Sequence, residues 1–174
     1  MPFDRIDCGT CLLRRWRRSD RDTLIHYANN RSVWRNLRDQ FPSPYSLADA
    51  EHWIREAAAL QPQTHFAIAV DGAAVGAVGL HLKKDVRRLS AEIGYWLGEE
   101  FWGRGIATEA VRAVTGHAFA CFDVVRVYAG AFEWNDASMR VLEKAGYTRE
   151  ARLRKAITKD GRTIDLMLYA IVRE

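Results

Sequence analysis

A strand, a glycine-rich loop and a long helix are predicted for residues 91–122, AEIGYWLGEEFWGRGIATEAVRAVTGHAFACF. The apolar run Ile93–Leu97 is typical of a buried strand. The loop Gly98–Gly105 holds three glycines, which allow backbone conformations that other residues resist. From Ile106 to Phe122, apolar residues recur at helical spacing and give the helix one apolar face. This succession limits the folds available to the rest of the chain.

The start of this helix is suited to binding phosphate. Free N–H groups point out of a helix N-terminus, and the helix dipole adds positive potential there. A dinucleotide-binding fingerprint fits Gly103 and Gly105 but has Thr108 where its third glycine belongs, and a Walker A loop needs a Gly-Lys-Ser/Thr that is absent. Two interpretations remain open: a loop that only joins strand to helix, and a cradle for the pyrophosphate of coenzyme A.

Hairpins and crossover helices alternate along the rest of the chain. Asp71-Gly72 is a hairpin turn signal between strands predicted at 64–70 and 75–82. Ser46 caps a predicted helix that ends near residue 60, and a further helix is predicted over Asp136–Ala145 with Gly146 as its C-cap. A final hairpin is expected around Lys159–Gly161. This order predicts an α/β chain with a mixed, α+β type of sheet.

The segment Trp102–Ala107, WGRGIA, resembles the acetyl-CoA loop of the GCN5-related N-acetyltransferases (GNAT), whose usual form is Gln/Arg-x-x-Gly-x-Gly/Ala. Gly105 and Ala107 match this form. Trp102 departs at the first position, and that departure is typical of the ribosomal-protein N-acetyltransferase branch, the RimJ/RimL type. The resemblance runs from about residue 11 to 173. It implies a single GNAT domain over 1–174, with about seven strands, a splayed central pair and about four helices.

The same resemblance implies acetyl-CoA as the acetyl donor. The backbone of Trp96 and Leu97 would run along the pantetheine arm, with the Leu97 N–H as the oxyanion donor. Asn135, which is also an ordinary helix N-cap, would bond the cofactor arm. The pyrophosphate would be held by the loop residues Gly103, Arg104, Gly105, Ile106, Ala107 and Thr108.

Acetyl transfer to an amine also needs a base for the amine and an acid for the leaving thiolate. Glu92, at the start of the central strand, is the candidate base, acting directly or through water. An exposed glutamate at a strand end would give the same pattern. Ser138 is the candidate acid, because many relatives carry a tyrosine where this chain has Leu142. That departure keeps open a non-catalytic acetyl-CoA sensor or interaction module on the same fold.

Other titratable residues are assigned structural roles. His65 and His81 lie on strands near the expected cleft, where a histidine is usually structural. Cys8 and Cys11 have Cys-x-x-Cys spacing without a second pair, and Cys121 is expected in the core. No His/Asp/Glu/Cys grouping has metal-ligand spacing, so no metal is expected.

Charge and composition limit the classes of partner that the chain can bind. The formal charge is +4, which suits an anionic partner, but the Arg14–Arg18 cluster is interpreted as a solvated surface rather than a nucleic-acid site. No run is long and apolar enough for a membrane span, and MPFDRIDCGT lacks a signal core. With three cysteines, a reducing cytoplasm is expected. A homodimer remains open.

The acceptor side is expected to be built by residues 30–45 and 156–163. Trp34, Phe41 and Tyr45 either line it or hold the early helices together. The resemblance implies a small-molecule or peptide amine acceptor, such as a protein N-terminus, a polyamine or an antibiotic. The sequence does not choose among these acceptors.

Overall fold

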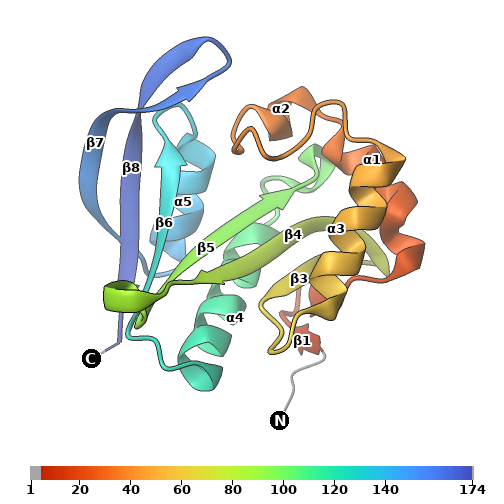
Figure 1. Cartoon of the computed structure of the whole chain (residues 1–174), viewed down its shortest axis with the longest axis horizontal. Helices are drawn as coiled ribbons and strands as arrows, with labels where there is room; N and C mark the ends of the chain where they lie inside the picture. The colour runs from red at the N-terminus through yellow and green to blue at the C-terminus, as the bar shows by residue number, and fades with distance from the viewer. Residues whose placement is uncertain (1–4, 174) are drawn as a thin grey trace.

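The computed structural model describes residues 5–173. Its strands form one eight-stranded sheet in the order β1-β2-β3-β4-β5-β6-β8-β7 (Figure 1). The strands are β1 (Arg5–Asp7), β2 (Leu12–Arg14), β3 (His65–Val70), β4 (Ala73–Leu82), β5 (Ser90–Leu97), β6 (Arg126–Phe132), β7 (Thr148–Lys159) and β8 (Arg162–Val172). The predicted mixed α/β fold is confirmed, and the extra strand over the predicted seven is accounted for by β1, whose three residues carry no strand pattern.

Five α-helices occur between residues 5 and 173, together with three short 3₁₀ helices. The α-helices are α1 (Arg21–Ala28), α2 (Arg31–Trp34), α3 (Leu47–Ala59), α4 (Ile106–Cys121) and α5 (Asp136–Lys144). The 3₁₀ helices are η1 (Arg18–Asp20), η2 (Asp85–Arg87) and η3 (Glu99–Phe101). None of these helices has both the length and the apolar character needed to cross a bilayer.

The sheet has a hydrophobic core on each face. On one face α4 packs on β4 and β5, and α5 packs beside it; on the other, α1 and α3 contact each other and cover β4 and β3. Alternation along β5 divides its side chains between the two faces, because successive residues of a strand point in opposite directions. Ile93 and Leu97 belong to the α4 core, whereas Trp96 packs in the α1–α3 core.

The sheet divides at its only parallel pair within residues 5–173. β5 and β6 pair only over Ser90–Glu92 and Arg126–Tyr128. Beyond that point β5 stays paired with β4 as far as Leu97, and β6 stays paired with β8 as far as Phe132. Figure 1 shows β5 and β6 spreading apart from this point. The predicted splayed central pair is therefore present, with Glu92 where it opens.

Several local predictions are confirmed. Asp71 and Gly72 have φ of 49° and 85°, the pair of positive values that a tight hairpin turn requires. The Ser46 side chain accepts a hydrogen bond from Asp49 N at 3.2 Å, and the Asp49 carboxylate accepts one from Ser46 N at 2.8 Å. α3 therefore begins with a reciprocal capping box.

Two predictions, for the arginine cluster and for Cys121, are wrong. At the start of η1 the Asp20 carboxylate accepts a hydrogen bond from Arg17 N at 2.8 Å. Asp20 also forms a two-bond ion pair with Arg14 at 2.8 and 2.9 Å, and both residues are at least 95% buried. The arginine cluster is thus not wholly solvated, because a buried charge needs a partner. Cys121, expected in the core, is exposed at the end of α4.

Candidate active site

The loop before α4 presents unpaired N–H groups to open space. Gly103 and Gly105 have φ of 75° and 78°, and Gly105 is the N-cap of α4. The first helical bond runs from Glu109 N to Gly105 O at 3.1 Å. Among the backbone hydrogen bonds of residues 5–173, none is donated by an N–H of residues 103–108. A Cβ built on either glycine would meet no atom within 4 Å, so this positive helix terminus is accessible to an anion.

Trp102 anchors this loop to the end of β5. Its indole Nε1 donates a hydrogen bond to the Leu97 carbonyl at 2.7 Å, while the residue stays 42% exposed. The guanidinium of Arg104 lies 5.3 Å from the ring centre of Phe101. Trp102, which departs from the usual acetyl-CoA loop pattern, therefore holds the loop before α4 against the end of β5.

The backbone N–H groups at the end of β5, next to this loop, alternate between β4 and the gap. Gly98 N donates to Val75 O at 2.8 Å, so Gly98 is turned toward the β4 side of β5. Because backbone groups of alternate residues point to opposite neighbours, the N–H groups of Leu97 and Tyr95 are directed toward β6. The Trp96 ring lies against Phe41, with ring centres 5.5 Å apart.

Ser138 and Asn135 lie on the α5 side of the gap. Asn135 Oδ1 accepts a hydrogen bond from Ser138 N at 3.1 Å, which confirms its capping role. Ser138 Oγ and Tyr95 Oη lie 2.6 Å apart, across α5 and β5. Burial raises the pKa of Tyr95, so this phenol stays protonated and able to donate at neutral pH. Sequence reasoning missed Tyr95; its only signal was its place on the same face of β5 as Ile93 and Leu97.

Tyr147 forms a similar pair elsewhere, with its hydroxyl 2.7 Å from Thr115 Oγ1. Burial raises the pKa of Tyr147 to about 12. The pair joins α4 to the start of β7 within the core, so Tyr147 has a structural role.

Glu92 is held by two cations at the point where the strands separate. Its carboxylate accepts from Lys83 Nζ at 2.7 Å and from the Arg38 guanidinium, and its side chain is 17% exposed. The interpretation of Glu92 as an exposed strand-end residue is therefore wrong. Both of its oxygens are engaged, so an amine must displace one cation or act through water to reach the carboxylate.

Two histidines lie beside Glu92 on the same face of the sheet. His81 is paired with Glu92 across β4 and β5, and its ring centre is 4.9 Å from that of His65. Burial, with a smaller contribution from His81, lowers the pKa of His65 to about 4. Burial also lowers the pKa of His81, against the opposing effect of Glu92. Both imidazoles are therefore neutral at pH 7.

This histidine pair predicts an acid-sensitive fold. The unfolded chain protonates His65 near its ordinary pKa of 6.5, whereas the folded chain does so only near 4. Between these values the unfolded state binds more protons, so the free energy of unfolding falls as pH falls, by about 1 kcal/mol per pH unit. Urea unfolding at pH 7, 5.5 and 4.5 is expected to show this slope, and His65→Gln is expected to reduce it. An equal slope in the variant would contradict the prediction.

The two predicted acceptor segments meet across the mouth of the gap. Arg31 of α2 pairs with Asp160 at 2.6 Å, at the tip of the β7–β8 hairpin. Lys159 Nζ bonds Asp39 at 2.7 Å and lies 3.6 Å from the ring centre of Trp34. These contacts join segments more than a hundred residues apart, and Figure 1 shows the hairpin tip facing α2.

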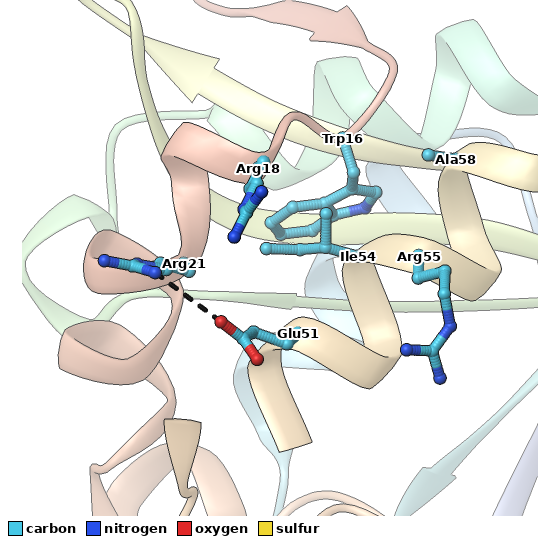
Figure 2. A pocket seen from close by; sticks show the side chains of 7 residues that line it. All are labelled: Trp16, Arg18, Arg21, Glu51, Ile54, Arg55 and Ala58. Carbon is cyan, nitrogen blue, oxygen red and sulfur yellow. Dashed lines mark hydrogen bonds and ion pairs between the residues drawn. The ribbon is translucent and has the colours of Figure 1, made fainter. Parts of the chain in front are cut away.

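The cavity shown in Figure 2 lies elsewhere, between η1 and α3. It has a volume of about 410 Å³ and is lined by Trp16, Arg18, Arg21, Glu51, Ile54, Arg55 and Ala58. Arg21 faces Glu51 across it at 3.5 Å. A second cavity of about 440 Å³ lies between α1 and η3, beside Asn30 and Glu99. The first cavity is lined by no predicted site residue, and the second only by Asn30 of the predicted acceptor segment 30–45.

A metal centre has no support in the part of the chain that the structure describes. No group of three or more His, Cys, Asp or Glu side chains between residues 5 and 173 is arranged to hold an ion. Cys8 and Cys11 are free thiols at the turn between β1 and β2, where Cys8 N bonds Cys11 O at 2.9 Å.

Comparison with known proteins places these features in a family context. A family model described as an acetyltransferase (GNAT) domain matches residues 11–148. The putative ribosomal N-acetyltransferase YdaF of Bacillus subtilis is 36% identical over 103 residues, which cover 59% of this chain and 56% of YdaF. The probable N-acetyltransferase YjcK of the same organism is 40% identical over 110 residues, 62% of this chain and 61% of YjcK. The chain thus spans less than two thirds of these curated relatives.

Solved structures extend the similarity over almost the whole chain. One is RimL, a ribosomal L7/L12 alpha-N-protein acetyltransferase in complex with coenzyme A. It superposes with a TM-score of 0.85 at 23% identity and covers 97% of this chain and 98% of its own. RimJ of Mycobacterium smegmatis, in complex with CoA-disulfide, superposes with a TM-score of 0.80 at 25% identity. The match covers 97% of this chain and 84% of the RimJ chain. The two likenesses support the same fold.

Proposed function

The chain belongs to the GNAT acetyltransferase family, and on that premise we propose that it transfers an acetyl group from acetyl-CoA to a primary amine by direct attack in a ternary complex. The observation that supports this most is that the unpaired N–H groups before α4 adjoin the gap between β5 and β6. The unpaired N–H groups of residues 103–108 lie at one end of the β5–β6 gap, and Glu92 lies at the other. A long donor with an anionic end and an amide-containing arm fits this arrangement.

The backbone would hold and orient the donor. N–H groups of Gly103–Thr108 bind the pyrophosphate, supported by the dipole of α4. The open N–H groups of Tyr95 and Leu97 face the pantetheine arm, and the Leu97 N–H is directed at the acetyl oxygen. Asn135 contributes its side-chain amide from the opposite side of the gap. Positioning of this kind supplies a large part of the rate when no covalent enzyme intermediate forms.

Two side-chain groups would move the protons. The amine nitrogen bonds to the acetyl carbon as the carbon–sulfur bond breaks, so one proton must leave nitrogen and one must reach sulfur. Glu92 takes the first, directly or through water, once the acceptor displaces Lys83 or Arg38. Ser138 gives the second and recovers a proton from Tyr95, whose hydroxyl is 2.6 Å away, and water then returns a proton to Tyr95.

The engagement of Glu92 by two cations favours one alternative, a non-catalytic acetyl-CoA sensor or interaction module. Thiol release from acetyl-CoA across a panel of peptide and small-molecule amines separates the two functions. Acetylated product identified by mass supports the enzyme. Micromolar coenzyme A binding with no product from any amine supports the sensor.

A further inference from the structure

Two arginines share one tryptophan at the mouth of the gap. The guanidinium carbon of Arg35 lies 5.0 Å from the ring centre of Trp134, and that of Arg162 lies 5.5 Å from it. Arg35 follows α2, Arg162 begins β8, and Trp134 lies in the turn between β6 and α5. The indole Nε1 donates to Asn36 Oδ1 at 3.0 Å, which fixes the ring. The three elements therefore bring two like charges to one indole ring.

Neither guanidinium has a carboxylate partner among the ion pairs of residues 5–173. The neighbouring cations do: Arg31 pairs with Asp160, Lys159 with Asp39, and Arg38 with Glu92. Like charges held together repel each other, and an anion between them removes that cost. Within residues 5–173, the pair on Trp134 thus has no carboxylate to compensate its charge.

The surrounding charge has the same sign. Residues 31–39 hold three arginines and one aspartate, and residues 152–163 hold five basic residues and one aspartate. These two segments therefore sum to +6, whereas the whole chain carries +4. A positive potential at the mouth attracts anions and repels polycations.

Arg35 and Arg162 also belong to the two segments, residues 30–45 and 156–163, that are predicted to form the acceptor side. Trp134 directly precedes Asn135, the cap of α5 beside the gap. Arg35 belongs to the segment whose Arg38 bonds Glu92, and Arg162 belongs to the hairpin tip that meets this segment. An amine near Glu92 would therefore leave the rest of its molecule close to Arg35 and Arg162.

We propose that Arg35 and Arg162 are specificity-determining residues that bind a carboxylate of the acceptor, so that the substrate class is the amine of an acidic peptide rather than a polyamine. This inference rests on the proposed function. Guanidinium groups suit the role because their planar donors pair with both oxygens of a carboxylate. Trp134 keeps the two groups in place through cation–π contacts.

The test compares two peptides that share a free α-amine, Ser-Glu-Glu-Ala-Gly-Tyr and Ser-Gln-Gln-Ala-Gly-Tyr. Their dissociation constants are measured by calorimetry with coenzyme A present, and their kcat/KM values with acetyl-CoA. Wild type is expected to favour the acidic peptide at least fivefold in both quantities, with a smaller ratio at high salt. In the Arg35→Gln/Arg162→Gln variant the ratio is expected to approach one, with binding of the neutral peptide unchanged.

Arg5→Gln is the matched control, because it removes one exposed arginine at the opposite edge of the sheet. It is expected to keep the wild-type ratio. Equal binding of both peptides by wild type, or a ratio that survives the double substitution, would overturn the inference. Acetylation of no peptide despite selective binding of the acidic one would contradict the proposed function and leave the anion site supported.

Discussion

Replacement of Gly105 by glutamate is expected to weaken acetyl-CoA binding at least about a hundredfold, measured by calorimetric titration. Gly105 has φ of 78°, a conformation that side chains other than glycine resist, and a Cβ there would point into open space beside the helix start. A carboxylate at this position would compete with the pyrophosphate for the N–H groups of residues 103–108. Loss of two charge-assisted hydrogen bonds, about 3 kcal/mol, corresponds to this factor.

Gly72→Glu is the matched control for this substitution. Gly72 has φ of 85° and open space around its Cβ position, but it lies in the turn between β3 and β4. The two variants should lose similar stability from backbone strain, and only Gly105→Glu should lose affinity. Unchanged affinity in a folded Gly105→Glu variant, or an equal loss in both, would refute the role of the loop.

Ser138→Ala is expected to lower kcat about a hundredfold while the dissociation constant for acetyl-CoA stays within about twofold. General acid catalysis contributes factors of about 100 to 10,000 to the rate. Ser138 lies in the first turn of α5, beside the gap, and its hydroxyl contacts that of Tyr95, so Ser138 is the first proton donor of the pair. The cap of α5 uses the Ser138 backbone N–H, so the helix should remain intact. Tyr95→Phe removes only the second proton donor and is expected to cost about tenfold in kcat.

Tyr147→Phe provides the control for the tyrosine substitution. Its hydroxyl also bonds a neighbouring hydroxyl, that of Thr115, but within the core between α4 and β7. It should reduce the free energy of unfolding by about 1 kcal/mol and leave kcat unchanged. A normal kcat in Ser138→Ala would assign the proton to water and remove Ser138 from the mechanism.

Local features of the fold were predictable because neighbouring residues determine them. The glycines of the loop before α4, the capping box of Ser46 with Asp49 and the Asp71-Gly72 turn each depend on a few adjacent positions. The splayed pair was predictable only through the resemblance to GNAT proteins, since no periodicity within a strand shows where its pairing stops.

Contacts between distant segments were not predictable from the sequence. Arg14 lies in an arginine run, and nothing in that run shows that Asp20 is buried with it. Tyr95 reaches Ser138 only because of how β5 and α5 pack, and Trp134 receives Arg35 and Arg162 from segments well separated along the chain. Cys121 continues the apolar pattern of α4, yet the helix ends there and leaves it exposed.

The central claim is that N–H groups before α4 and along the open edge of β5 bind one coenzyme A molecule. Titration of ¹⁵N-labelled protein with coenzyme A, followed by ¹H–¹⁵N correlation spectra, observes these groups directly. We predict the largest shifts at the amides of Gly103–Thr108 and at Tyr95 and Leu97, with little change in β1 and β2. Binding that leaves the Gly103–Thr108 amides unshifted and moves residues around the η1–α3 cavity instead would contradict the claim.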